Sequence, residues 1–292
     1  MDIKQLYYFC TIVEEGQITK AAARLHMAQP PLSQQLKQLE NELDVVLFER
    51  QGRKLLLTDS GKSLYENAQK ILADLEDIKT KVKEMNAGIR GKLSIGVSKT
   101  CFSYLPERIQ YFRAEYPEVL FHIIEGDTAY ISDLLVNRSI EVAITRFPIE
   151  QENIEIKAFK SEPYILIIPK TWKHLMSNKT KIALKEIKQL PLMLLHRIHG
   201  AGQFEIITNA FKDQQLKPNI ILECPDVSIL FLLVNSEIGA TIVPKGAIKN
   251  QSYDNIHIIE IEDANIHSES GVIWLKDRHL SKCTQLFIDS FV

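Results

Sequence analysis

The sequence predicts an α/β protein built from three successive parts, because the spacing of its apolar residues changes twice along the chain. Residues 1–58 show helical spacing followed by two short strand-like runs, and residues 59–90 carry one unbroken helical stripe. From residue 91 onward, short apolar runs alternate with helical segments, which is typical of an open sheet covered by helices. A chain of 292 residues is long enough for two or three domains of ordinary size.

Composition and charge are those of an ordinary globular chain. Hydrophobic residues make up 45% of it, charged residues 25%, and the net charge is −2. Residues 1–65 hold eight Lys or Arg and eight Asp or Glu, so a nucleic-acid-binding surface would have to be local. We see no secretory signal, no apolar run of membrane-spanning length and no metal-binding cysteine pattern. We therefore expect a cytoplasmic protein with no membrane partner, no metal and no cofactor.

Two short helices separated by a tight turn are expected within about residues 18–37. Gly16 should end the helix that precedes them, and Thr19 should cap the first of the two. The second opens at Gln29-Pro30-Pro31, where proline is tolerated because the first helical N–H groups have no intrahelical acceptor. Its apolar stripe consists of Leu32, Leu36, Leu39 and Leu43.

The opposite face of this second helix carries residue types that suit contact with DNA. Gln34 can form two hydrogen bonds with an adenine edge, while Ser33 and Lys37 can contact bases or phosphates. The solvated face of an ordinary amphipathic helix is the alternative. The hairpin expected at residues 47–57 favours DNA contact, because its cationic tip resembles the wing of a winged helix-turn-helix. The predicted DNA contacts are Thr19, Gln29, Pro30, Pro31, Ser33, Gln34, Lys37, Arg50, Arg53 and Lys54.

Residues 59–90 are expected to form one long linker helix that is capped by Thr58 and reaches about residue 87. The steps between its apolar residues alternate between four and three, which is the spacing of a coiled-coil seam. A core helix lying on its own domain is the alternative. The coiled coil predicts a homodimer. The seam consists of Leu64, Ala68, Ile71, Leu75, Ile78, Val82 and Met85.

Several of these segments resemble the signature of the LysR family of transcriptional regulators. They are residues 19–33, the run LFER at residues 47–50 and the run LTDSG at residues 57–61. Length and layout match as well, so the resemblance extends over the whole chain. Ala28 departs from it, since many relatives have a polar residue there, and one backbone or phosphate contact is then lost. The resemblance implies a DNA-binding regulator, dimeric or tetrameric, that responds to a small effector and binds an interrupted palindrome in double-stranded DNA.

The third part alternates strands and helices in two series. The resemblance implies that the last strand and helix return to the first series, giving a two-lobed, periplasmic-binding-protein-like effector domain. Lobe I would comprise residues 91–161 and 267–292, and lobe II residues 162–266. The expected strands are 93–97, 119–124, 141–145, 165–168, 192–195, 220–223, 240–243 and 271–275, and the expected helices are 105–116, 131–136, 204–214, 227–235 and 284–291.

A ligand site is expected between the lobes, because ligands of open α/β sheets bind beyond the carboxyl ends of the strands. Hydroxyl groups and free N–H groups at helix N-termini suit an anion, and nearby cations would add to that preference. The sequence therefore predicts an effector that carries a carboxylate or phosphate. Its predicted contacts are Ser98, Lys99, Thr100, Thr128, Arg146, Phe147, His196, Gln203, Asp226 and Val227.

For three of these residues the sequence leaves a structural role open. Arg146 could form a salt bridge within the protein, His196 could be an ordinary polar loop residue, and Lys99 could extend into solvent. Catalytic motifs are absent from the sequence, so we do not expect an enzyme.

Two of the four cysteines suggest an alternative mode of regulation. Cys101 and Cys224 fall near crevice loops, one in each lobe, so a thiol-redox-sensing regulator of the same fold is the alternative. A disulfide between them would need Cα atoms within about 7 Å. Redox-sensing relatives carry two cysteines close together in the second lobe, which this chain lacks.

Overall fold

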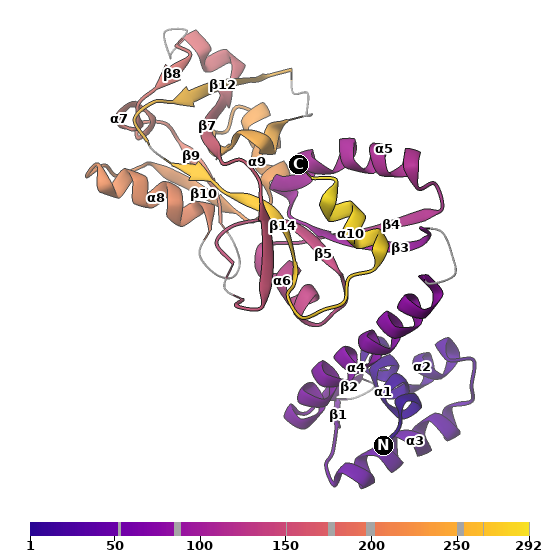
Figure 1. Ribbon diagram of the computed structural model, residues 1–292. Helices are drawn as coiled ribbons and strands as arrows, with labels where there is room; N and C mark the ends of the chain where they lie inside the picture. Colours follow the sequence, from indigo (N-terminus) through magenta and orange to yellow (C-terminus); the bar gives the residue numbers. More distant parts are fainter. Residues whose placement is uncertain are drawn as a thin grey trace. The chain divides into compact units, whose positions relative to one another are not determined.

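The computed structural model describes residues 1–51, 54–84, 89–149, 151–174, 179–196, 202–249, 254–264 and 266–291. The chain forms two compact units (Figure 1). One consists of residues 1–88 with the short segment 137–139, and the other of residues 89–136 and 140–292. Within the described ranges, no helix is long and apolar enough to cross a membrane.

The N-terminal unit begins with the helices α1 (Ile3–Glu15), α2 (Ile18–Arg24) and α3 (Gln29–Leu43). Gly16 ends α1 in a left-handed conformation with φ of 66°, as predicted, because glycine adopts positive φ without steric cost. The predicted cap of α2 is wrong. The connection after Gly16 is so short that helical geometry resumes at Ile18, so Gln17 is the N-cap residue and Thr19 lies inside the first turn.

The packing of α3 follows its apolar stripe. Leu32 and Leu39 are almost fully buried, and Leu36 and Leu43 pack against the same cluster. Ala21 and Ala22 of α2 are also buried there, since their small side chains allow the helices to approach closely. The two prolines occupy the first turn of α3. The helix-turn-helix therefore has the predicted apolar core and leaves the polar face of α3 outside it.

The strands β1 (Phe48–Gln51) and β2 (Lys54–Leu57) form the predicted antiparallel hairpin, whose tip at residues 52–53 lies outside the described residues. Thr58 follows it and links hairpin to helix. Its hydroxyl accepts a 3.0 Å hydrogen bond from the Gly61 N–H and donates to the Val46 carbonyl at 2.7 Å. A Cβ at Gly61 would lie 2.2 Å from the Leu47 carbonyl oxygen, so only glycine fits. The threonine and the glycine of the LTDSG run are thus both required by the tight connection between the hairpin and the helix that follows it.

The predicted seam lies on the long helix α4 (Asp59–Glu84), and its two halves differ in burial. Ala68 is fully buried and Leu64 is partly buried, both in the core of their own unit. In contrast, Ile71 is 43% exposed and Ile78 is 59% exposed. The first half therefore behaves as a core helix, and the second half presents apolar side chains to solvent. Met85 and the side chain of Val82 lie outside the described residues.

The second unit contains two sheets, and we call the part around the first of them lobe I. Its strand order is β4-β3-β5-β14-β6, and β14 is antiparallel to both of its neighbours. The last strand therefore returns to lobe I, as expected. Its strands are β3 (Gly91–Val97), β4 (Val119–Glu125), β5 (Val142–Arg146), β6 (Ile154–Ala158) and β14 (Ser270–Leu275), and its helical segments are η1 (Lys99–Tyr104), α5 (Leu105–Glu115), α6 (Thr128–Val136) and α10 (Lys282–Asp289).

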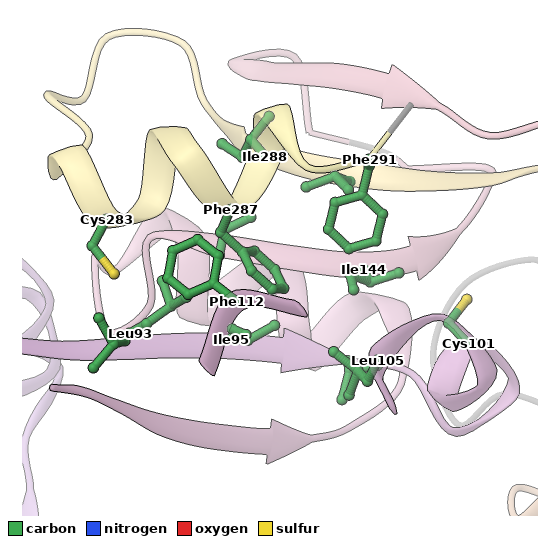
Figure 2. Close-up of a cluster of buried hydrophobic side chains, with 14 residues drawn as sticks. Leu93, Ile95, Cys101, Leu105, Phe112, Ile144, Cys283, Phe287, Ile288 and Phe291 are labelled. Carbon is green, nitrogen blue, oxygen red and sulfur yellow. The ribbon is translucent and has the colours of Figure 1, made fainter. Parts of the chain in front are cut away.

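The last helix closes the core of lobe I. Figure 2 shows Phe287 of α10 beside Phe112 of α5, and their ring centroids lie 5.8 Å apart. Phe291 packs against Phe287 with a centroid distance of 5.2 Å. Strand β6 was not predicted, because most of its residues are exposed and they form no apolar run.

Lobe II has the strand order β10-β9-β11-β7-β12-β8, and β13 pairs with β7 off this path. The polypeptide crosses between the lobes twice, after β6 and between β13 and β14. The strands β8 and β12 were not predicted. The strands are β7 (Glu162–Pro169), β8 (Lys181–Ile182), β9 (Leu192–Leu195), β10 (Ile220–Cys224), β11 (Ala240–Pro244), β12 (Ile256–Ile261) and β13 (His267–Ser268), and the helical segments are η2 (Lys170–His174), α7 (Leu184–Ile187), α8 (Gln203–Asp213), α9 (Val227–Asn235) and η3 (Lys245–Ile248).

Candidate functional site

The polar face of α3 is open to solvent. Gln34 and Lys37 are exposed, and neither has a hydrogen-bond or ion-pair partner among the residues that the structure describes. Such side chains keep their full hydrogen-bonding capacity for a ligand. Thr19, Gln29, Pro30 and Pro31 are exposed as well, and Ser33 is half-buried. Arg53 and the side chains of Arg50 and Lys54 lie outside the described residues.

The second predicted site is a crevice between the two lobes, where a cavity of about 70 Å³ is lined by residues of both. The carboxyl ends of β3, β4 and β5 supply the lobe I side, as expected for an open α/β sheet. Phe147 and Asp226 are not among the lining residues. The predicted residues that do line the cavity are Ser98, Lys99, Thr100, Thr128, Arg146, His196, Gln203 and Val227.

Among the residues that the structure describes, two buried polar atoms in this crevice have no hydrogen-bond partner. They are Ser98 Oγ of lobe I and Gln203 Oε1 of lobe II. Their side chains belong to residues that are 7% and 6% exposed. Buried polar atoms are nearly always paired, so two unpaired ones at one cavity are suited to bind a polar ligand. By contrast, Thr128 Oγ1 lies 2.8 Å from Thr145 Oγ1 and is already satisfied.

Arg146 is 2% exposed and is bonded within the protein on every side of its guanidinium. It donates to Thr100 Oγ1 at 3.0 Å, to the Thr100 carbonyl at 2.7 Å and to Ser268 Oγ at 2.8 Å. Its Nη1 also lies 2.7 Å from Glu162 Oε1, at the start of the first strand of lobe II. The salt-bridge role is therefore present, and little of the positive charge of Arg146 is left for an effector.

Lys99 also forms ion pairs instead of extending freely into solvent. Its Nζ contacts the Asp226 carboxylate across the crevice and lies 3.4 Å from Glu125 Oε1. Asp226 in turn caps α9, accepting a 2.8 Å hydrogen bond from the Ser228 N–H. Burial acts to raise the pKa of Asp226, but the hydrogen bonds from Lys99 and Ser228 outweigh it and hold that pKa below its ordinary value. We call the contact between Lys99 and Asp226 the lobe latch.

His196 stands at the lobe II rim of the crevice and is 41% exposed on its side chain. Its Nδ1 lies 2.6 Å from Glu223 Oε2, and its ring stacks on Phe204 with centroids 4.6 Å apart. Arg197 and His199, which follow His196 in the sequence, lie outside the described residues. Phe147 packs in a hydrophobic cluster of lobe I that includes Ile131 and Ile273, which explains its absence from the cavity.

The helix N-termini at the crevice are less free than the sequence suggested. The Gly202 N–H at the start of α8 donates to Glu205 Oε2 at 2.5 Å, and the Tyr130 N–H of α6 donates to Asp127 Oδ1 at 2.8 Å. Together with the cap of α9, three helix starts are partly satisfied by carboxylates of the chain itself. The hydroxyls of Ser98 and Thr100, and Lys99 once an anion displaces its carboxylate partners, thus remain the most direct means of holding an anion.

Comparisons with known proteins agree with this layout. The family model described as LysR substrate binding domain matches residues 86–292, and the one for the bacterial regulatory helix-turn-helix protein of the lysR family matches residues 3–62. The HTH-type transcriptional regulator BsdA of Bacillus subtilis is 36% identical over 292 residues, which cover 100% of each chain. The chain belongs to the LysR family of transcriptional regulators.

Other relatives agree with this assignment. A probable RuBisCO transcriptional regulator of Thalassiosira pseudonana is 31% identical, with 98% of this chain and 95% of that protein covered. The fold is similar to that of full-length CbnR, solved in complex with its target DNA, with a TM-score of 0.78 at 24% identity and with 99% and 98% of the two chains covered. This LysR-family chain is a DNA-binding regulator with an effector-binding domain, and its named relatives are regulators and not enzymes.

Some crevice residues of this LysR-family regulator were missed from the sequence. Glu125 ends β4, Gly126 and Asp127 follow it, and all three line the cavity beside Thr128. The strand-end rule that selected Thr128 could have found them, because they occupy the same connection. Glu162 was missed too, and no sequence signal indicated that it pairs with Arg146, since the two residues belong to different lobes.

The two cysteines of the redox alternative are both buried. Cys101 is fully enclosed in the lobe I core, and burial raises the pKa of its thiol above the ordinary value. A raised pKa lowers the thiolate fraction and hence the reactivity toward oxidants. Cys224 Sγ lies 3.5 Å from the Asp226 carbonyl oxygen and is also largely hidden. These surroundings are those of structural thiols.

Proposed function

We propose that this regulator binds an interrupted palindrome as a dimer and that a small carboxylate- or phosphate-bearing effector between its lobes controls that binding. The pair of unpartnered buried atoms, Ser98 Oγ and Gln203 Oε1, is the observation that carries the effector site. They belong to opposite lobes, so one molecule that satisfies both would favour the closed arrangement over an open one.

DNA recognition is assigned to the exposed face of α3. Its width suits the major groove, where Gln34 would pair with a base and Lys37 with a phosphate. A two-fold dimer presents two such helices, so the half-sites should lie about one helical turn, or a multiple of it, apart. The cationic hairpin tip, with Arg50, Arg53 and Lys54, would then lie along the phosphates.

Two sets of exposed apolar residues support self-association. On α4, Ile71 and Ile78 continue the seam beyond the part buried in the unit itself, which suits a coiled-coil dimer. On the second unit, Leu120 of the edge strand β4 is 65% exposed and Leu232 of α9 is 59% exposed. Exposed apolar side chains on an edge strand and a helix support a further contact between copies, and thus a tetramer.

The effector must meet a site whose own charges are already balanced. Lys99 and Arg146 are paired with carboxylates, so an incoming carboxylate or phosphate would compete with Asp226 and Glu125 for Lys99. Ser98 would donate to the same anionic group, and Gln203 Oε1 would accept from a donor elsewhere on the effector. A cavity of about 70 Å³ holds only a few heavy atoms, so the effector is compact or the lobes open to admit it.

The test is a calorimetric screen of the full-length protein against small carboxylates and phosphate esters. Some of the carboxylates should carry a hydroxyl or ammonium group. We expect Ser98→Ala and Gln203→Leu to weaken binding of a hit, each by about 1–2 kcal/mol, because each removes one hydrogen bond to the ligand. Ser132→Ala is the matched control, since Ser132 Oγ is also buried and unpartnered but does not line the crevice.

The same hit should change the affinity of wild-type protein for operator DNA, and the crevice variants should lose that response. Equal binding by the Ser98 and Ser132 variants would place the effector elsewhere. If the effector binds but DNA affinity does not change, effector control is contradicted, whereas the proposed DNA recognition is unaffected.

A further inference from the structure

The charges of the interlobe crevice do not balance, because carboxylates outnumber cations among the described residues around it. Arg146 is paired with Glu162, so this pair contributes no net charge. Lys99 faces both Asp226 and Glu125. One lysine compensates only one of these two negative charges, so the crevice carries a net negative charge of its own.

Two further features add to this negative charge. Asp127 lines the cavity, and its Oδ1 accepts a 2.8 Å hydrogen bond from the Tyr130 N–H, which is a neutral donor. In the described part of the chain, Asp127 has no ion-pair partner. On the lobe II rim, the ring of His196 lies 2.6 Å from Glu223 and 4.0 Å from Glu205. A cavity with this surplus of carboxylates attracts a positively charged group.

An effector with only negative charge would increase the imbalance. Its carboxylate would take Lys99 from Asp226 and Glu125, and both of these carboxylates would then lack a cation. The loss of a compensating charge is more unfavourable in a partly buried site than in open solvent. A positive group on the same molecule avoids this loss, because it takes the place of Lys99 beside the two carboxylates.

Two neighbouring strand ends bring the partners of both charges close together. Strands β3 and β4 are parallel, and Val97 is opposite Glu125 in their register. The Gly126 N–H donates to the Val97 carbonyl at 3.3 Å, so the strands stay paired up to the cavity. Ser98, whose hydroxyl suits a carboxylate, follows Val97 directly, and neighbouring strands lie about 4.8 Å apart. One small molecule can therefore reach the Ser98 hydroxyl with one charged group and the Glu125 carboxylate with the other.

Lobe II supplies an acceptor for the same positive group. Gln203 is 6% exposed, and its Oε1 has no hydrogen-bond partner among the described residues. An ionised carboxylate of an effector has no proton to donate to it, whereas an ammonium group has three N–H donors. An ammonium group can thus donate to Gln203 and to lobe I carboxylates together. A hydroxyl could also donate to Gln203, but it would leave the carboxylates of the crevice uncompensated.

We propose that the crevice takes a small zwitterion of the α-amino-acid type. Its ammonium group would lie among Glu125, Asp127 and Gln203, and its carboxylate would bind Ser98 and Lys99. The cavity volume of about 70 Å³ is far below that of drug-sized sites and suits a short side chain. This inference rests on the proposed function and narrows its effector from carboxylates or phosphate esters to amino acids.

The test is titration calorimetry of the full-length protein with L-alanine and L-serine. Each is compared with the hydroxy acid in which a hydroxyl replaces the ammonium group, L-lactate or L-glycerate. We expect each amino acid to bind about tenfold or more tightly than its hydroxy acid, since only the amino acid carries the compensating charge. Glu125→Gln should lower the affinity for L-alanine about tenfold and leave that for L-lactate unchanged or higher. Gln203→Glu should act in the opposite direction, strengthening L-alanine binding and weakening L-lactate binding.

Glu118→Gln is the matched control, because Glu118 is an exposed glutamate immediately before β4, at the strand end away from the crevice. It should bind all four compounds as wild type does. Equal affinities for amino acid and hydroxy acid, no binding of either amino acid, or parallel changes for L-alanine and L-lactate in the Glu125 and Gln203 variants would each overturn the inference.

The Ser98→Ala variant separates this inference from the proposed function. Binding of L-lactate that Ser98→Ala weakens, without binding of L-alanine, would overturn the zwitterion while supporting the effector site itself. Binding of L-alanine that Ser98→Ala leaves unchanged would contradict both.

Discussion

Helix α3 and the interlobe crevice both carry cationic residues, but among the described residues only the lysine of α3 is left without an ion-pair partner. On α3, Gln34 and Lys37 are exposed and have no partner in the described part of the chain. In the crevice, Lys99 and Arg146 are held by Asp226, Glu125 and Glu162. The same residue types are thus available to an outside partner in one region and stabilise the protein in the other.

This difference shows that counting cations does not reveal which of them are available. A lysine on a solvated helix face can bind phosphate without losing an earlier contact. A buried arginine bound to a carboxylate would have to give up that bond, and breaking such a pair is strongly unfavourable. The hypothesis that Arg146 holds the effector must therefore be tested together with its effect on stability.

The largest expected effect is at the buried ion pair. Glu162→Gln leaves the charge of Arg146 buried without its partner, so it should lower the free energy of unfolding of the second unit by about 3–5 kcal/mol. Urea denaturation of the full-length protein measures this loss. Glu186→Gln, which removes an exposed ion pair with Lys179, should cost at most about 1 kcal/mol. Similar losses in the two variants would show that burial does not distinguish the pairs.

The second-largest effect is expected for a mutation in the exposed half of the α4 seam. Ile78→Asp replaces an apolar contact by a charge in the proposed coiled coil, and burial of an isoleucine is worth about 1.5–3 kcal/mol. We expect the dimer to dissociate at least tenfold more readily in sedimentation equilibrium. Lys79→Asp adds the same carboxylate one residue away from the seam and should dissociate less. A variant at Ile78 that stays as dimeric as wild type would assign dimerisation to another surface.

Mutations of a proposed base contact and of a proposed phosphate contact should affect DNA binding in different ways. Gln34→Ala should weaken binding to the preferred operator by about 1–3 kcal/mol and relax the preference at one base pair. Arg53→Ala should weaken binding to all sequences alike and reduce the slope of log affinity against log salt by about one. Binding assays on specific and scrambled DNA at several salt concentrations measure both. The assigned roles are wrong if both variants lose the same affinity on every sequence.

The lobe latch should have a smaller effect that depends on pH. Asp226→Asn keeps the cap of α9 but removes the charge that faces Lys99, and a partly exposed pair of this kind is worth about 0.5–1 kcal/mol. The folded pKa of Asp226 is lowered, so its stabilising contribution is present above the unfolded pKa of about 4 and is lost as pH falls through the folded pKa.

The difference in unfolding midpoint between wild type and Asp226→Asn should therefore be visible at pH 6 and shrink near pH 3. It should also shrink at high salt, because a partly exposed pair is screened. The double variant with Lys99→Met should lose little more than either single variant. A difference that is constant across this pH range would contradict an ionised latch.

The cysteines should give the smallest response. Because Cys101 and Cys224 are buried, mild peroxide should leave both thiols unmodified and leave operator binding unchanged. Mass spectrometry of peroxide-treated protein checks this. Oxidation of either thiol, or a disulfide between them, accompanied by altered DNA affinity would instead support the redox-sensing alternative.

The sequence allowed the local structure to be predicted wherever one periodic signal was strong. The stripe of α3, the cap at Thr58 and the hairpin from Phe48 to Leu57 agree with the structure. The prediction was wrong at Thr19, where a short connection after Gly16 overrode a good capping residue. It missed β6 and β12 because these strands lack a continuous apolar run.

By itself, the sequence determined the order of the parts, the family and the residue types near each site, because these depend on local spacing and short motifs. Only the tertiary structure decided which charged side chains form ion pairs within the protein. Glu162 meets Arg146, and Asp226 meets Lys99, only because the chain crosses between two lobes and brings distant strand ends together. It also decided that Ala68 is buried while Ile78 is exposed, since the same helical stripe first packs on its own unit and then extends beyond that core.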